Sequence, residues 1–184
     1  ATSTDGNTSA SISDTVTVTV QSQADAPSLR VSGSATGTED SAITLDIDAA
    51  LTDSDEVLSI TISGVPDGAT LSAGTDNGDG TWTLSPDDLD GLTITPPADY
   101  SGSFNLGVTA TSTDGTDTAS ISDSITVDVT GEADTPTLSV SDAAGTEDSA
   151  IALDIDAALT DAGEVLSITV TGVPEGATLS AGTD

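Results

Sequence analysis

The sequence contains no cysteine, histidine or methionine, only one basic residue, and one residue each of Trp, Tyr and Phe. Without histidine or cysteine, the usual zinc, haem and iron–sulfur sites cannot form, and neither can a Ser-His-Asp or Cys-His catalytic unit. With Arg30 as the only base, the chain offers no cradle for phosphate, and its field repels nucleic acid and anionic membranes. These absences predict a protein that is not an enzyme and has no nucleic-acid partner.

Long apolar segments are also missing. No apolar run approaches the roughly 20 residues that span a bilayer, so we expect no direct membrane insertion. The chain begins without Met and without a signal-peptide pattern, which is typical of an excised or processed piece of a longer protein. Since there is no cysteine, no disulfide stabilises the fold.

Acidic residues dominate what is present. The 32 Asp and Glu residues give a formal net charge of −31 over 184 residues, a composition that can indicate disorder. However, 35% of the residues are hydrophobic, and they alternate with polar residues at period two, as half-buried strands do. The sequence therefore predicts a folded all-β protein whose carboxylates must be neutralised.

The chain repeats itself at an interval of about 108 residues. Residues 38–76 and residues 146–184 are identical at 33 of 39 positions, and the ATSTDG motif at 1–6 returns at 110–115. This period is too long for one turn of a solenoid and suits one whole β-sandwich domain. We therefore expect tandem β-sandwich domains, one for each repeat.

This repeat divides the chain into three parts. They are the C-terminal strands of a preceding repeat (1–23, the preceding piece), one complete repeat (24–132, the complete unit) and the N-terminal part of a following repeat (133–184, the following piece). Neither piece contains all the strands of a domain. Each would expose an apolar face and open sheet edges unless it is completed by a neighbouring molecule or by more of a longer chain.

Alternation in the complete unit predicts seven or eight strands and no helix. The candidate strands are residues 29–31, 43–47, 57–62, 69–73, 81–84, 92–94, 104–110 and 125–129. The Asn-Gly-Asp-Gly sequence at 77–80 is a strong hairpin signal. Asp123 falls on the inward register of the last strand, which predicts a bulge there. Eight alternating strands would leave both ends of the unit on one side, so one short segment must be an excursion.

The acidic residues lie mainly in loops that a sandwich would bring together. If units join head to tail, alternate loops lie at opposite ends, and the acids gather at the junctions between units. For the junction after the complete unit we expect Glu39, Asp40, Asp99, Glu132, Asp134, Asp161 and Glu164. For the junction before it we expect Asp25, Asp53, Asp55, Glu56 and Asp114. Glu147 and Asp148 repeat Glu39 and Asp40 in the following piece.

Five or more adjacent carboxylates cannot all stay ionised without a counterion. Ca²⁺ takes six to eight oxygen ligands in flexible geometry, whereas Mg²⁺ demands a stricter arrangement and retains its water. The sequence therefore predicts several bound Ca²⁺ ions, which would lock the angle between units and make the chain a stiff rod. The alternative is that the acids are solvated loop residues that bind no ion.

Several motifs resemble a known family. ADAP at 24–27, TED at 38–40, NGDGTWTLSP at 77–86 and GLTITPPADYSG at 91–102 are similar to the tandem cadherin-like or immunoglobulin-like repeats of giant bacterial RTX adhesins, exported by type I secretion. The resemblance implies tandem Greek-key β-sandwich domains of the cadherin-like or immunoglobulin-like type. It also implies an extracellular, cell-surface location and calcium-rigidified extender domains that support cell adhesion and biofilm formation. It also implies junction calcium held by Glu39, Asp134 and Asp161. The LDRE and DxNDN motifs of true cadherins are absent.

The resemblance and the repeat favour a non-catalytic structural extender whose partners are neighbouring repeats of the same chain. The alternative is a subunit or segment of a surface filament or layer, in which identical neighbouring chains complete the partial domains. A terminal binding domain for sugar, protein or ice has less support, since three aromatic residues are too few for a sugar-binding platform.

Overall fold

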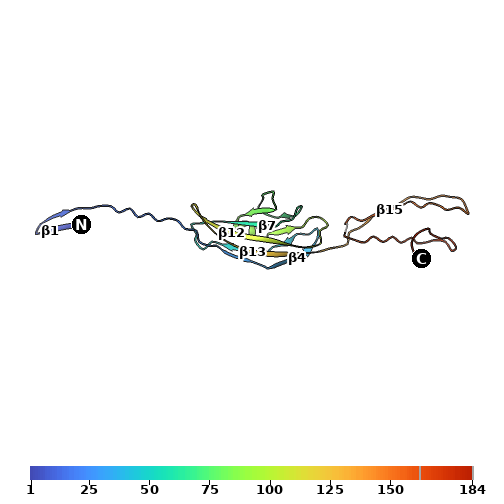
Figure 1. Ribbon diagram of the computed structural model, residues 1–184, viewed down its shortest axis with the longest axis horizontal. Coiled ribbons are helices and arrows are strands. Elements are labelled where there is room, and N and C mark those ends of the chain that lie inside the picture. The colour runs from blue at the N-terminus through green and yellow to red at the C-terminus, as the bar shows by residue number, and fades with distance from the viewer. Residues whose placement is uncertain (162, 184) are drawn as a thin grey trace.

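A computed structural model describes residues 1–161 and 163–183 of the protein (Figure 1). Its described residues form strands and one 3₁₀ turn, and they contain no α-helix. The complete unit forms a layered body in the middle, and the two pieces extend from its opposite ends. The structure is therefore all-β, as the alternation predicted.

The complete unit has a larger sheet in the order β4-β13-β12-β7-β10-β9. Its strands are β4 (Ser34–Thr38), β13 (Asp117–Thr130), β12 (Gly102–Asp114), β7 (Val57–Ser63), β10 (Thr81–Leu84) and β9 (Thr75–Asp76). The facing layer consists of β5 (Ile43–Thr44), β11 (Thr93–Thr95) and β8 (Thr70–Leu71), with β3 (Ser28–Val31) paired to β6 (Ile47–Ala50). The pair β4 and β13 is parallel, whereas the other pairs are antiparallel.

The core between the layers follows from the period-two alternation, because successive side chains of a strand point to opposite faces. In β7, Leu58, Ile60 and Ile62 are buried. They join Leu106 of β12 and Ile94 of β11 in one apolar cluster. Residues from both layers contribute to this cluster, so the unit has the character of a β-sandwich.

Several details of the fold differ from the expectation. Strand β4 was not predicted, because its sequence is rich in Gly, Ser and Thr. It begins just after β3 ends, and it moves the chain from the facing layer to the edge of the larger sheet, beside β13. A 3₁₀ turn, η1 (Pro86–Leu89), was not predicted either. The predicted turn at 77–80 is confirmed, since Trp82 pairs with Asp76 across it. The strand before the turn is β9, however, and not the predicted segment 69–73, whose strand β8 pairs with β11 in the facing layer.

The predicted bulge at Asp123 is wrong. Strands β12 and β13 pair without interruption, and Asp123 lies opposite Val108. Strand β4 pairs only with residues 126–130, so β13 is an edge strand at Asp123 and its side chain is exposed. A carboxylate at such an edge needs no bulge to reach water.

The eight predicted strands would have left both ends of the unit on one side, and the short strand β9 resolves this difficulty. It is antiparallel to β10 and adds one change of direction between β8 and β10. The linker before the complete unit and the linker after it therefore leave from opposite ends, as Figure 1 shows.

The two pieces outside the complete unit contain isolated pairs of strands. In the preceding piece, β1 (Thr2–Asp5) pairs with β2 (Thr8–Ser11). In the following piece, β14 (Thr137–Val140) pairs with β15 (Ile155–Ala158) in the register that β3 and β6 use. Their large apolar side chains are exposed, among them Val16, Val18, Val20, Leu153 and Val165.

Candidate metal centre at the junction between units

One end of the complete unit brings together loops that are distant in the sequence. Strand β4 ends beside the end of β13, since Thr38 pairs with Thr130, and Glu39 and Asp40 follow directly. Strand β12 begins at the same end, because Gly102 pairs with Val129. The loop before β12 therefore carries Asp99 to this end, where the trailing linker (residues 131–136) leaves the unit.

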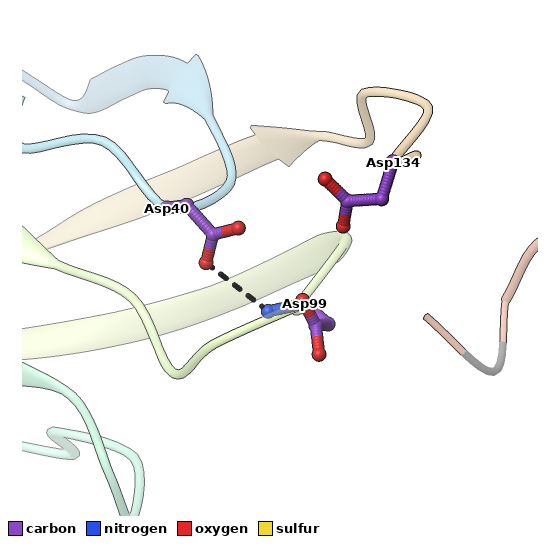
Figure 2. Close-up of side chains that lie close together, drawn as sticks. All are labelled: Asp40, Asp99 and Asp134. Atoms are coloured by element: carbon purple, nitrogen blue, oxygen red, sulfur yellow. Dashed lines mark hydrogen bonds between the residues drawn. The ribbon is translucent and has the colours of Figure 1, made fainter. Parts of the chain in front are cut away.

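Three carboxylates meet at this end. Carboxylate oxygens of Asp40, Asp99 and Asp134 all lie within 4.8 Å of one another. Figure 2 shows that the three side chains come from three separate segments, the turn after β4, the loop before β12 and the trailing linker. The backbone N–H of Asp99 also donates to Oδ1 of Asp40 at 3.2 Å. This group offers the oxygen ligands that hard divalent cations prefer.

The backbone at two of these residues has an unusual conformation. Asp40 has φ 55° and Asp99 has φ 56°, and Asp148, the counterpart of Asp40 in the following piece, has φ 60°. Among the described residues these are the non-glycine residues with positive φ. Asp tolerates this left-handed region better than most residues. The similar φ angles of Asp40 and Asp148 show that the repeated TED sequence forms the same turn in both copies.

Glu39 directly precedes Asp40 and is buried. Its side chain is 4% exposed, and its Oε1 accepts a hydrogen bond from the backbone N–H of Glu132 at 2.6 Å. Its Oε2 is buried and has no hydrogen-bond partner. An unpaired charge in such a place is strongly destabilising. This orphaned oxygen is an independent sign that the residues present fit a cation.

The following piece supplies the other side of the junction. The backbone N–H of Asp134 donates to Oε1 of Glu164 at 2.6 Å, so the trailing linker contacts carboxylates of both units. Asp161 is 8% exposed, and its Oδ1 accepts from the N–H of Gly163 at 2.7 Å. Both acidic residues lie near enough to Asp99 for their charges to raise its pKa.

The junction before the complete unit repeats this downstream half. The backbone N–H of Asp25 donates to Oε1 of Glu56 at 2.6 Å, as Asp134 does to Glu164. The N–H of Asp55 donates to Oδ1 of Asp53 at 3.1 Å, as Gly163 does to Asp161. Glu56 is 7% exposed and its Oε2 is buried without a hydrogen-bond partner. The same arrangement thus occurs at both junctions.

Two residues outside the five expected at this first junction also take part in it. Asp117, near the tip of the β12–β13 hairpin, accepts a hydrogen bond from the backbone N–H of Ala24 at 3.0 Å. The hydroxyl of Ser112, which is fully buried, donates to the backbone carbonyl of Asp25. The predicted Asp114 lies at the same tip and is half-buried. These hydrogen bonds cannot be predicted from the types of side chain in the sequence, because their partners are backbone groups that every residue carries.

Other predicted residues take no direct part in the three-carboxylate group. Glu132 contributes its backbone N–H, and its side chain is exposed. Glu147 and Asp148 are exposed in the following piece. Over residues 1–161 and 163–183, the group of three or more close carboxylates is that of Asp40, Asp99 and Asp134.

Asp99 gives the junction a pH dependence. Desolvation by the surrounding atoms, followed by repulsion from Asp40, Asp134, Asp161 and Glu164, raises the pKa of Asp99 above its ordinary value. For an acid with a raised folded pKa, the stabilising contribution is fully present below the unfolded pKa and is lost as pH rises through the folded pKa. We expect the metal-free junction to become more stable on acidification, and Ca²⁺ to lower the pKa of Asp99. Carboxyl ¹³C titration in chelator and in Ca²⁺ measures this change.

Asp88 is the control for that titration. Hydrogen bonds from the hydroxyl and backbone N–H of Ser85 lower the pKa of Asp88, and η1 lies outside the cluster. Its titration should therefore be the same with and without Ca²⁺. Identical titration of Asp99 in both conditions would contradict a cation site beside it.

The features that could support other functions are weaker. Tyr100, Phe104 and Trp82 pack partly buried against the core, and the rings of Tyr100 and Phe104 meet edge to face with centroids 5.8 Å apart. A groove of about 550 Å³ between β6 and η1 contains Arg30. The following piece has Ser139 in place of Arg30, so this groove is not part of what repeats along the chain.

The described residues include no helix that is long and apolar enough to cross a membrane. No protein-family model and no curated protein matches the sequence.

Proposed function

We propose that this chain is a segment of a non-catalytic structural extender on a bacterial cell surface, made rigid by Ca²⁺ bound at the junctions between repeats. The observation that carries the proposal is the convergence of Asp40, Asp99 and Asp134 within 4.8 Å at the exit of the complete unit. The buried, unpartnered Oε2 atoms of Glu39 and Glu56 support it. In this role the repeats hold adhesive domains of a large extracellular protein away from the cell.

The strand order supports the proposed Greek-key type of domain. A sheet that contains β4, β13, β12 and β7 faces a layer of β3, β6, β5, β11 and β8. The first strand of the unit is divided between the layers, as β3 and β4. This order is typical of immunoglobulin-like sandwiches, whose first, second and fifth strands share a sheet opposite the third, sixth and seventh. Together with the repeat of about 108 residues, it favours tandem cadherin-like or immunoglobulin-like domains.

The chemistry of the junction favours Ca²⁺ among common cations. All the converging side chains are carboxylates, which are hard oxygen ligands, and they come from flexible loops of two units. Ca²⁺ accepts six to eight such ligands in variable geometry, and extracellular Ca²⁺ modules bind with dissociation constants of about 10⁻⁴ to 10⁻³ M. Asp40, Asp99 and Asp134 would hold the ion, with Glu39 on its inner side and Asp161 and Glu164 contributed by the next unit.

An ion in this position would act on the angle between units. The trailing linker is already held from both sides, through the backbone N–H groups of Glu132 and Asp134. Without a cation the surrounding carboxylates repel one another, and this repulsion drives the units apart. With a cation the same side chains attract a shared centre, so the linker and both units become one rigid assembly.

Small-angle scattering of the 184-residue chain tests this function. Saturating Ca²⁺ should give the longest maximum dimension and the narrowest distance distribution, and chelation should shorten and broaden it. Asp134→Ala should leave the chain flexible after the complete unit even with Ca²⁺, because it removes a central ligand. The fold of the complete unit should remain, since Asp134 lies outside its core.

Asp142→Ser is the matched control, because it removes one charge from the following piece and installs the residue that the complete unit has at Ser34. It should respond to Ca²⁺ as the original chain does. Unchanged scattering on chelation would refute the proposed function. A particle mass that grows with protein concentration, independently of Ca²⁺, would instead support the filament or layer, which the exposed apolar side chains of both pieces favour.

A further inference from the structure

The complete unit holds its leading linker (residues 22–27) by several contacts. The N–H of Ala24 donates to Oδ2 of Asp117 at 3.0 Å, and the N–H of Asp25 donates to Oε1 of Glu56 at 2.6 Å. The carbonyl of Asp25 accepts a hydrogen bond from the hydroxyl of Ser112. Two of these three contacts, those of Asp117 and Ser112, do not depend on a glutamate with an orphaned oxygen. The β12–β13 hairpin therefore joins the leading linker firmly to the unit that follows it.

The complete unit makes fewer hydrogen bonds to its trailing linker than to its leading linker. After the last β4–β13 contact, in which the N–H of Glu39 donates to the carbonyl of Thr130 at 3.0 Å, one side-chain contact remains. This is the hydrogen bond from the N–H of Glu132 to Oε1 of Glu39 at 2.6 Å. The next contact along the linker, from the N–H of Asp134, already belongs to Glu164 of the following piece.

We propose that Glu39 is a positioning residue that latches the trailing linker only while a cation is bound, so that the joint opens on its upstream side when the cation leaves. This inference rests on the proposed function. One oxygen of Glu39 holds the linker amide, and the other, Oε2, which is buried without a hydrogen-bond partner, would be stabilised by the cation. The linker then remains with the downstream unit through the hydrogen bond from the N–H of Asp134 to Glu164, whose side chain is only half-buried, and the hinge is the segment 131–132.

The two linkers differ in their dependence on a cation because Oε2 of Glu39 has no hydrogen-bond partner. With the cation gone, Glu39 would remain 96% buried as an unpaired charge if it kept its place. Burying an unpaired charge costs more than one hydrogen bond to a backbone amide returns. Glu39 therefore turns toward water and releases the N–H of Glu132. The hydroxyl of Ser112 is neutral and keeps the leading linker in place whether or not a cation is bound.

Amide hydrogen exchange in the 184-residue chain, with Ca²⁺ and with chelator, tests the latch residue by residue. Chelation should accelerate exchange of the Glu132 amide by about tenfold or more, because its only hydrogen bond opens. The Ala24 amide, held by Asp117, should change by less than about threefold. The amides of Ile60 and Leu106 report that the complete unit stays folded in both conditions.

Three variants separate the latch from general destabilisation. Glu39→Gln keeps a carbonyl oxygen for the Glu132 amide and removes the charge, so that amide should stay protected even in chelator. Glu39→Ala removes the acceptor, so the amide should exchange rapidly in both conditions. Glu147→Gln makes the same change at the exposed counterpart in the following piece and should behave as the original chain.

The outcomes distinguish the latch from the function beneath it. If chelation loosens the joint in scattering but the Glu132 amide does not respond, the latch is wrong and the extender stands. If Ala24 is released together with Glu132, one-sided opening is wrong. A Glu39→Gln variant that loses protection in chelator would also overturn the latch. If chelation changes neither scattering nor any linker amide, the proposed function fails first.

Discussion

Removal of Ca²⁺ by a chelator is expected to lower the Tm of the chain by about 10–20 °C. A ligand that binds only the folded state stabilises it by about 2.7 kcal/mol when its concentration is 100 times its dissociation constant. For a domain of about 100 residues, each kcal/mol moves Tm by about 4–8 °C. Calorimetry at about 10 mM Ca²⁺ and in chelator measures the difference, given a dissociation constant of about 10⁻⁴ M.

The repeat supplies a matched pair of variants for this experiment. Asp40→Asn removes a carboxylate from the three-residue group and should reduce the response of Tm to Ca²⁺. Asp148→Asn makes the same change in a turn of the same conformation, with φ 60° against 55°, away from that group. It should leave the response intact. Equal Tm values in Ca²⁺ and in chelator, at matched ionic strength, would argue that the acids bind no specific ion.

Ile60→Ala is expected to reduce the free energy of unfolding of the complete unit by about 2–5 kcal/mol, in the range of large-to-small core substitutions. Ile60 is 0% exposed and lies in β7 between Leu84 of β10 and Ala110 of β12. The substitution removes apolar contacts and leaves a cavity that these paired strands cannot close. Denaturant unfolding in saturating Ca²⁺ measures the loss.

Ile168→Ala is the control for that prediction, because Ile168 has the same place in the repeat. In the following piece its side chain is 51% exposed, so truncation should cost less than about 1 kcal/mol. Similar losses for both variants would mean that the following piece also has a packed core, which would contradict the exposure of its apolar residues.

The fold could be predicted where burial follows the alternation. Strand β7 and the β12–β13 hairpin were predicted because Leu58, Ile60 and Leu106 recur at period two beside polar residues. Strand β4 could not be predicted, since its pairing with β13 is set by the geometry of the edge rather than by an apolar pattern. The bulge at Asp123 was predicted wrongly for a related reason. The alternation assigns its side chain to the inner face, but it does not show that β4 stops short of Asp123 and leaves that face open to water.

The candidate site was predictable at the level of loops. Alternating strand directions placed Asp40, Asp99 and Asp134 at one end, and the structure brings their carboxylates together. The hydrogen bonds of Glu39 and Glu56 to linker amides could not be foreseen, because any residue offers the same backbone N–H. Ser112 was missed for the same reason.

The parallel pairing of β4 with β13 has a mechanical consequence. The leading linker enters the strand segment β3–β4, and the trailing linker leaves from the far end of β13. Tension on the two linkers would therefore pull β4 and β13 in opposite directions along their lengths. The contacts from Ser34↔Thr126 to Thr38↔Thr130 would then bear load simultaneously in shear instead of peeling apart singly. Resistance to forced unfolding is governed by the unfolding rate, so this pair of strands would let a domain of ordinary equilibrium stability withstand sustained tension along the chain.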